Sequence, residues 1–306
     1  MTASLVFTQL LNGLQVGVLL FLLAAGLTLV FGIMDFVNLA HGSLYMVGTY
    51  IATAATNASG SFLLGGAAAV AGTLAVGVAV DRIVLAGLYR REHLDQVLAT
   101  FGLVLFFNEA VRIVWGPSPL YSQVPGWLDG SVQLLGFGYA TYRLAIIGVG
   151  LGVAAFLYWL INLTRVGMLI RAGATNPAMV SALGVNVRLL NMAIFGLGAA
   201  LAGLAGLMAG PIFSVQPGMG EPVLIQTLVV IIVGGIGSIR GAFLAALIVG
   251  VVDTMGRIFL PIWMSKAMDP SIAQAAGPAL ASMLIYLLMA VVLAFKPEGL
   301  FPVKHG

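Results

Sequence analysis

The amino-acid sequence predicts an all-α, polytopic membrane helical bundle, and three observations lead to this fold class. Hydrophobic residues make up 61% of the 306 residues, and charged residues make up only 8%. Apolar stretches of about 20 residues, the length that a helix needs to cross about 30 Å of hydrocarbon, recur along the whole chain. The segments between them are too short for a water-soluble domain, so we expect one transmembrane domain over residues 1–306.

Nine apolar segments between polar, proline or glycine breaks are the candidate membrane helices, and eight to nine of them are expected to cross. No lysine or arginine occurs in residues 1–60, so the first segment is expected to stay as a span and not to be a signal peptide. The seventh is short and rich in glycine, and it either spans or re-enters. The segments cover residues 5–31, 36–57, 62–89, 94–115, 141–163, 188–212, 222–238, 241–263 and 277–295.

The positions of arginine and lysine predict the side of the membrane on which each loop lies, because loops rich in these residues stay in the cytoplasm. Loop 116–140 contains neither residue and is therefore predicted to be external. Alternation along nine crossings then places the C-terminus in the cytoplasm and the N-terminus outside. The basic clusters expected in the cytoplasm are Arg90 with Arg91, Arg165 with Arg171 and Arg188, and Lys296 with Lys304.

Missing residues and motifs exclude several classes of function. The chain has no cysteine, which excludes disulfides and cysteine nucleophiles, and none of its three lysines follows a glycine-rich phosphate loop. Its three histidines, His41, His93 and His305, lie in different segments, so no metal site is expected. We predict a protein that is not an enzyme, has no catalytic residue and no cofactor, contacts membrane lipid and does not bind nucleic acid.

Charged residues inside the predicted spans are expected to pair or to reach the membrane surface, because an isolated charge in hydrocarbon is costly. Two of the three pairs have the i,i+3 or i,i+4 spacing that places both side chains on one helix face. The pairs are Asp81 with Arg82, Glu109 with Arg112, and Asp253 with Arg257.

Small residues recur at four-residue spacing in segment 195–210, at Gly198, Ala202 and Gly206. Such a stripe lets helix backbones approach closely in lipid, so we predict tight helix packing along it.

The stretch DFVNLAHGSLYMVGTYIA, residues 35–52, places hydrogen-bonding side chains in an apolar neighbourhood. If residues 36–52 form one helix, an arc of about 100° holds the polar positions, and this arc is predicted to face the bundle interior. Asn38 and His41 then either fasten helices or line the substrate pathway. The positions on the arc are Asn38, His41, Gly42, Tyr45 and Thr49, while Leu39, Ala40, Leu44, Val47 and Ile51 are expected to face elsewhere.

The longest cytoplasmic loop is predicted to contain its own short helix, over residues 177–183. Asn176 can cap this helix, Pro177 suits its first turn, and Gly184 can end it. The helix either docks on a partner or folds back on the membrane surface. Its apolar residues are expected on one face: Met179, Val180 and Leu183.

Four stretches agree, in order along the chain, with the motifs of one transporter family. They are NLAHGSLYMVGTY, RAGATNPAMVSALGVNV, VGGIGSIRGAFLAALIVG (233–250) and KPEGLF (296–301). Together they resemble the LivH-like permeases of branched-chain amino acid ABC importers, over essentially the whole chain.

The resemblance implies a permease subunit in the bacterial inner membrane that forms the translocation pathway with a second, homologous permease. It also implies two cytoplasmic ATP-binding subunits and an external solute-binding protein, which delivers a branched-chain amino acid or a related small solute such as urea or an amide. Loop 164–187 would be the coupling loop that docks on an ATPase. The residues carried over to this role are Arg171, Ala172, Asn176, Pro177, Met179, Leu183 and Gly184.

Two positions depart from the pattern of this family. Arg240 stands where proline is common, and Gln226 stands where many relatives have lysine. A neutral residue in place of a cation within a span could change which solute the permease transports, so Gln226 is also a candidate pathway residue.

An alternative function from another class is a stand-alone channel or a secondary transporter, which the composition permits. Such proteins often show inverted repeats and ion sites on broken helices. The weak internal repeat and the structured loop 164–187 count against it.

Overall fold

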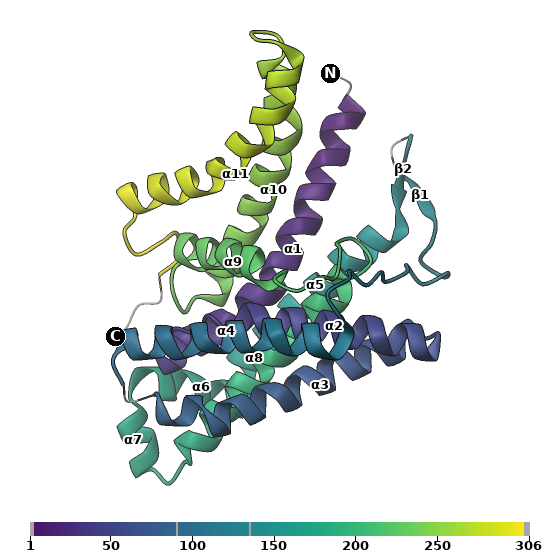
Figure 1. The fold of residues 1–306 in the computed structure, drawn as a ribbon. Helices are drawn as coiled ribbons and strands as arrows, with labels where there is room; N and C mark the ends of the chain where they lie inside the picture. Colours follow the sequence, from purple (N-terminus) through teal and green to yellow (C-terminus); the bar gives the residue numbers. More distant parts are fainter. Residues whose placement is uncertain (1–2, 90, 135, 303–306) are drawn as a thin grey trace. The chain divides into compact units, whose positions relative to one another are not determined.

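The computed structural model describes residues 3–89, 91–134 and 136–302, and most of this part of the chain is helical, which confirms the predicted all-α membrane class (Figure 1). The helices before the loop 116–140 are α1 (Ala3–Met34), α2 (His41–Ser59), α3 (Phe62–Ile83), the short 3₁₀ helix η1 (Leu85–Gly87) and α4 (His93–Trp115). The helices after it are α5 (Thr141–Leu163), α6 (Arg165–Thr175), α7 (Pro177–Ala182), α8 (Val187–Ala209), α9 (Gly220–Gly234), α10 (Ile239–Met264) and α11 (Pro270–Phe295).

Each of the nine predicted apolar segments corresponds to a helix. Seven of these helices are long and apolar enough to cross a membrane. Helix α2 has 19 residues but carries many polar side chains, and α9 has only 15 residues, which is about 22 Å at 1.5 Å per residue. The predicted number of eight to nine spans is therefore approximate, because it includes one polar helix and one short helix.

The described chain divides into two compact units. The first unit comprises described residues within Met1–Ala24, Gly126–Leu151 and Gln226–Val303. The second comprises described residues within Ala25–Pro125 and Gly152–Ile225.

Helices α2, α3 and α8 pack against one another in the second unit (Figure 1). A Cβ atom on Gly48 of α2 would lie 2.5 Å from Gly203 Cα on α8, and one on Gly203 would lie 2.9 Å from Ala69 O on α3. The three backbones are therefore too close for larger side chains. The predicted stripe of small residues is confirmed as a packing surface, because its three members are buried: Gly198, Ala202 and Gly206.

Glycine contacts also join the helices of the first unit. A Cβ atom on Gly17 of α1 would lie 2.6 Å from Ala246 O on α10, and one on Gly13 would lie 2.7 Å from Val251 Cα. Helices α10 and α11 lie side by side (Figure 1).

The end of α9 and the segment KPEGLF bind each other through their backbones. Leu300 N donates to Val233 O at 2.9 Å, and Phe301 N donates to Gly234 O at 3.0 Å. Gly235 has a φ of +101°, a conformation that favours glycine. Two of the four family-like motifs are thus parts of one structural feature.

The predicted helix over residues 36–52 is wrong at its start, because α2 begins at His41. Asn38 precedes the helix, and its Oδ1 accepts a hydrogen bond from Ala40 N at 3.0 Å. A short polar side chain that bonds to the nearby backbone in this way competes with helix formation. Asn38 is therefore not on the predicted polar arc.

The single interior face predicted for α2 is also wrong. Leu44 and Val47, which were expected to face away from the polar positions, are as buried as His41 and Tyr45. The reason is that α2 packs against both α3 and α8, so all sides of its first three turns are covered.

Loop 116–140 contains a β-hairpin that the sequence pattern did not predict. Strand β1 (Ser131–Leu134) pairs antiparallel with β2 (Phe137–Ala140). Their opposite residues run from Ser131 with Ala140 to Leu134 with Phe137.

Replacing Gly206 with alanine is expected to lower the free energy of unfolding by roughly 1–3 kcal/mol, the usual cost of overpacking. The new Cβ would lie 2.7 Å from Thr49 N and from Tyr45 O, and these backbone atoms cannot rotate away. Gly102→Ala is the matched control, because no atom of another described segment lies within 4 Å of its Cβ position. Thermal unfolding in detergent, followed by tryptophan fluorescence, measures both variants, and equal melting temperatures would contradict this packing.

Candidate functional site

The start of α2 and the start of α9 meet inside the second unit. A Cβ atom on Gly42 would lie 2.6 Å from Gly220 O and 2.9 Å from Leu224 Cβ. Only glycine at position 42 lets the two helix starts approach this closely. Gly42, one of the predicted pathway or fastening residues, therefore acts at a helix contact.

His41 and Tyr45 lie one turn apart at the same helix start, and both are buried, with 1% and 3% exposure. A Cβ atom on Gly26 would lie 3.1 Å from His41 Cε1, so the imidazole packs on the backbone of α1. Asn38 is 2% exposed, and its Nδ2 has no hydrogen-bond partner among the described residues. The structure thus brings Asn38, His41 and Tyr45 together, as predicted pathway or fastening residues. Gln226 is not among them: it is half-buried, in the part of α9 that belongs to the first unit.

Two polar residues that the sequence prediction missed hold the start of α9. Asn108, within α4, donates from Nδ2 to Glu221 Oε1 at 2.5 Å and accepts at Oδ1 from Gly218 N at 3.1 Å. An amide inside the apolar segment 94–115 and a carboxylate directly before the apolar segment 222–238 were the available signals.

Glu221, for which no pairing was predicted, differs from the acidic residues that were predicted to pair within spans. Glu109 binds Arg112 at 3.1 Å and Asp253 binds Arg257 at 2.9 Å, which confirms both pairs. Among the described residues, no cationic group lies within 4 Å of the Glu221 carboxylate. Asn108 is seven residues, or about 10 Å, from the end of α4, so this carboxylate lies at the depth of a membrane-crossing helix.

Loop 164–187 is folded into two short helices, of which α7 was predicted. Asn176 Oδ1 accepts from Met179 N at 2.9 Å, and Gly184 has a φ of +87° after the helix ends. The predicted cap and stop are thus confirmed, with α7 one residue shorter than expected. Helix α6 was not predicted; Arg171 on this helix donates to the carbonyl of Ile161 near the end of α5.

The apolar residues of α7 do not share one face as predicted. Val180 is 5% exposed, because it faces the helices of its own unit, while Met179 and Leu183 are 63% and 79% exposed. The surface of the loop is nevertheless available to a partner. Every residue predicted to dock on an ATPase is exposed: Arg171, Ala172, Asn176, Pro177, Met179, Leu183 and Gly184.

The hairpin and the start of α5 are both fixed to α1 by hydrogen bonds to the Asn12 side chain. Its Oδ1 accepts from Tyr139 OH at 3.2 Å and from Arg143 Nη1 at 2.6 Å. Burial raises the pKa of Tyr139, and the Arg143 guanidinium lowers it by a smaller amount. Tyr139 therefore stays protonated and donates this bond at neutral pH.

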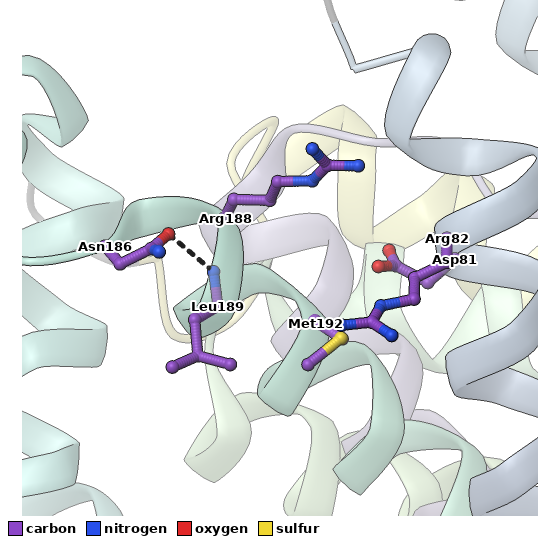
Figure 2. Close-up of a pocket in the computed structure, with 6 residues that line it drawn as sticks. All are labelled: Asp81, Arg82, Asn186, Arg188, Leu189 and Met192. Atoms are coloured by element: carbon purple, nitrogen blue, oxygen red, sulfur yellow. Dashed lines mark hydrogen bonds between the residues drawn. The ribbon is translucent and has the colours of Figure 1, made fainter.

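A cavity of about 400 Å³ opens between the end of α3 and the start of α8 (Figure 2). Asp81 and Arg82 were expected to pair or to reach the membrane surface. No ion pair joins them to each other in the described structure, because consecutive residues on a helix point in different directions, and the Arg82 side chain is exposed. Asp81 instead accepts a hydrogen bond from Tyr89 OH. The residues that line the cavity are Asp81, Arg82, Asn186, Arg188, Leu189 and Met192.

Comparison with known proteins identifies the family. A family model described as the permease component of the branched-chain amino acid transport system matches residues 9–293. The chain belongs to this permease family. It is therefore a permease subunit of an ABC importer, not an enzyme, and a multi-pass protein of the inner membrane, as predicted.

Three relatives show how far the similarity extends. The high-affinity branched-chain amino acid transport system permease protein BraD of Pseudomonas aeruginosa is 30% identical, over 95% of this permease and 94% of BraD. LivH of Salmonella typhimurium is 30% identical, over 82% and 86% of the two chains. A probable LivH of Methanocaldococcus jannaschii is 28% identical, over 79% and 78%. No solved structure matches the permease significantly.

Replacing Asn108 with alanine is expected to lower the free energy of unfolding by roughly 1–3 kcal/mol, because Glu221 and Gly218 N lose their partner. Asn162→Ala is the control, since the one hydrogen bond of its side chain to a described residue goes to Tyr158 O of its own helix. Thermal unfolding and hydrogen exchange at the Gly218 amide measure the effect. Identical exchange at Gly218 in the two variants would show that Asn108 does not hold α9.

Proposed function

We propose that this permease imports branched-chain amino acids, or a related small solute such as urea or an amide. It does so with a second homologous permease, two cytoplasmic ATP-binding subunits and an external solute-binding protein. The observation that carries the proposal is the exposed, capped loop 164–187 in a chain that matches branched-chain amino acid permeases over nearly its full length.

The proposed orientation places loop 164–187 in the cytoplasm, because Arg165, Arg171 and Arg188 lie in or beside it. The loop 116–140, with its hairpin, is then external, the C-terminus is cytoplasmic and the N-terminus is outside. Two of the basic residues used for this topology, Arg90 and Lys304, lie outside the described residues.

The coupling loop is proposed to pass movement of the ATPases to the membrane helices. The exposed side chains of Met179 and Leu183 offer apolar surface to an ATPase groove. Helix α8 begins at Val187, three residues after Gly184, so a displacement of α7 reaches α8 directly. Helix α8 is packed backbone to backbone on α2, whose first turn would move with it.

Coupling also requires that substrate and ATP each favour a different conformation of the permease. In the proposed cycle, ATP binding closes the ATPase pair and displaces α7. The permease then changes between outward and inward openings, and the substrate shifts the same equilibrium from the opposite side.

The proposed pathway passes the start of α2. His41 and Gly42 fasten this helix, since they pack on Gly26 and Gly220. Asn38 has a buried amide group that is available to a substrate, and the Glu221 carboxylate, which has no cationic partner in the described chain, attracts the ammonium group of an amino acid. Gln226 is proposed to influence selectivity from its position along α9.

A cysteine at position 178 tests the docking surface, because the native chain has no cysteine. Ala178→Cys is expected to react with an impermeant maleimide only from the cytoplasmic side and to cross-link to a co-expressed ATPase. Ser131→Cys in the exposed hairpin is the matched control and is expected to react only from outside. Labelling of position 178 only from outside would contradict the proposed coupling loop.

The substrate is tested by the ATPase rate of the reconstituted complex with its binding protein. Leucine, isoleucine and valine are expected to raise the rate more than urea or acetamide, because only amino acids offer an ammonium group to Glu221. Glu221→Gln, which keeps an acceptor for Asn108, is expected to reduce this preference by about tenfold, as for the loss of one charged partner. A response to urea or acetamide alone would contradict import of amino acids.

A further inference from the structure

The cavity between α3 and α8 plays no part in the proposed pathway or in the docking surface. It lies where α8 begins, directly after the coupling loop. Figure 2 shows its lining from two elements: Asp81 and Arg82 come from α3, and the remaining four residues come from the start of α8 and its cap. At about 400 Å³ it has the size of a small-molecule pocket.

Charges of both signs line this cavity, and among the described residues no direct ion pair joins them. Asp81 is 2% exposed, and no arginine nitrogen lies within 4.0 Å of its carboxylate in the part of the chain that the structure describes. Within the same residues, neither Arg82 nor Arg188 donates a hydrogen bond or forms an ion pair within 4.0 Å, although both guanidinium charges interact with the Asp81 carboxylate at longer range. Tyr89 OH donates to Asp81 Oδ1, and Oδ2 receives no such bond from a described residue.

Apolar surface completes the lining. Leu189 and Met192 are three residues apart on α8 and therefore share one face. Methionine adapts to apolar groups of different shape because its side chain is flexible. Asn186 uses Oδ1 to cap Leu189 N, which leaves its amide NH₂ group as a further donor.

We infer that this cavity binds an apolar amino acid in its zwitterionic form. A guanidinium of Arg82 or Arg188 would bind the ligand carboxylate, the Asp81 carboxylate would bind the ammonium group, and Leu189 and Met192 would cover the apolar side chain. A simple anion would be repelled by Asp81, and a simple cation by the two arginines. The ligand class is that of the proposed substrate, so this inference rests on the proposed function.

In the proposed topology the cavity opens on the cytoplasmic side, where imported amino acid accumulates. A ligand held by Asp81 on α3 and by Arg188 on α8 would bridge these two helices at the point where the coupling loop joins α8. Occupancy would thus resist relative movement of α3 and α8.

Equilibrium binding of radiolabelled L-leucine tests the inference, with the complete complex of permeases and ATPases in phosphatidylglycerol nanodiscs and without binding protein. Asp81→Asn, which keeps an acceptor for Tyr89, and Arg188→Gln are each expected to weaken binding at least about tenfold. Glu109→Gln and Arg112→Gln are the matched controls, because they change the same charges in an exposed pair on α4. Leucine is also expected to bind more tightly than 4-methylpentanoate, which lacks the ammonium group, and than 3-methylbutylamine, which lacks the carboxylate.

Several results would overturn the inference. Unchanged leucine binding in both cavity variants, or equal affinity for leucine and the two analogues, would show that the cavity does not recognise the zwitterion. A further test uses nanodiscs that contain phosphatidylethanolamine. If the cavity variants lose bound phosphatidylethanolamine while their leucine binding is unchanged, the cavity binds a lipid headgroup and not an amino acid. If the complex imports leucine but leucine binding does not depend on Asp81 and Arg188, this inference is overturned and the proposed function stands. If leucine binding depends on Asp81 and Arg188 but the complex imports no amino acid, the proposed function is overturned and the binding site stands.

Discussion

The close approach of α8 to α2 and α3 is the constraint on which the rest of the second unit depends. In lipid, helices gain little from hydrophobic burial against one another, so association relies on close packing of small residues. Gly48, Gly203 and Gly206 supply this contact, and backbone atoms of neighbouring helices occupy the space where their side chains would be. The contact holds α2 at Tyr45, Gly48 and Thr49, and α8 continues from there to loop 164–187, the proposed coupling loop.

Features set by local chemistry could be predicted from the sequence. Segment length and composition gave the positions of the nine apolar helices, because a membrane requires about 20 apolar residues in a helix that satisfies its own backbone. Asn176, Pro177 and Gly184 predicted α7, because a cap, a first-turn proline and a left-handed glycine act within a few residues. The predicted start of α2 was wrong, because periodicity alone does not reveal that the Asn38 side chain accepts a hydrogen bond from the backbone N–H of Ala40.

The candidate site could be predicted only in part. His41 and Gly42 stood out as polar or small residues in an apolar segment, but their packing on Gly26 and Gly220 depends on the fold. Asn108 and Glu221 are 113 positions apart in the chain, and only tertiary structure reveals that they bind each other. The burial of Val180 between exposed neighbours also could not be predicted. Helical periodicity shows which residues share a face, but only the tertiary structure shows which face is covered.

The chain belongs to a permease family by sequence similarity, and its proposed coupling to ATPases follows from the geometry of loop 164–187. Transport through this permease is then driven by ATP hydrolysis in partner subunits. Uptake of radiolabelled leucine into proteoliposomes distinguishes this mechanism from a stand-alone channel, when the permeases alone are compared with the permeases together with ATPases, binding protein and ATP. We expect uptake only with all components and ATP, and concentrative or equilibrating uptake by this chain alone would show that it does not depend on partner ATPases.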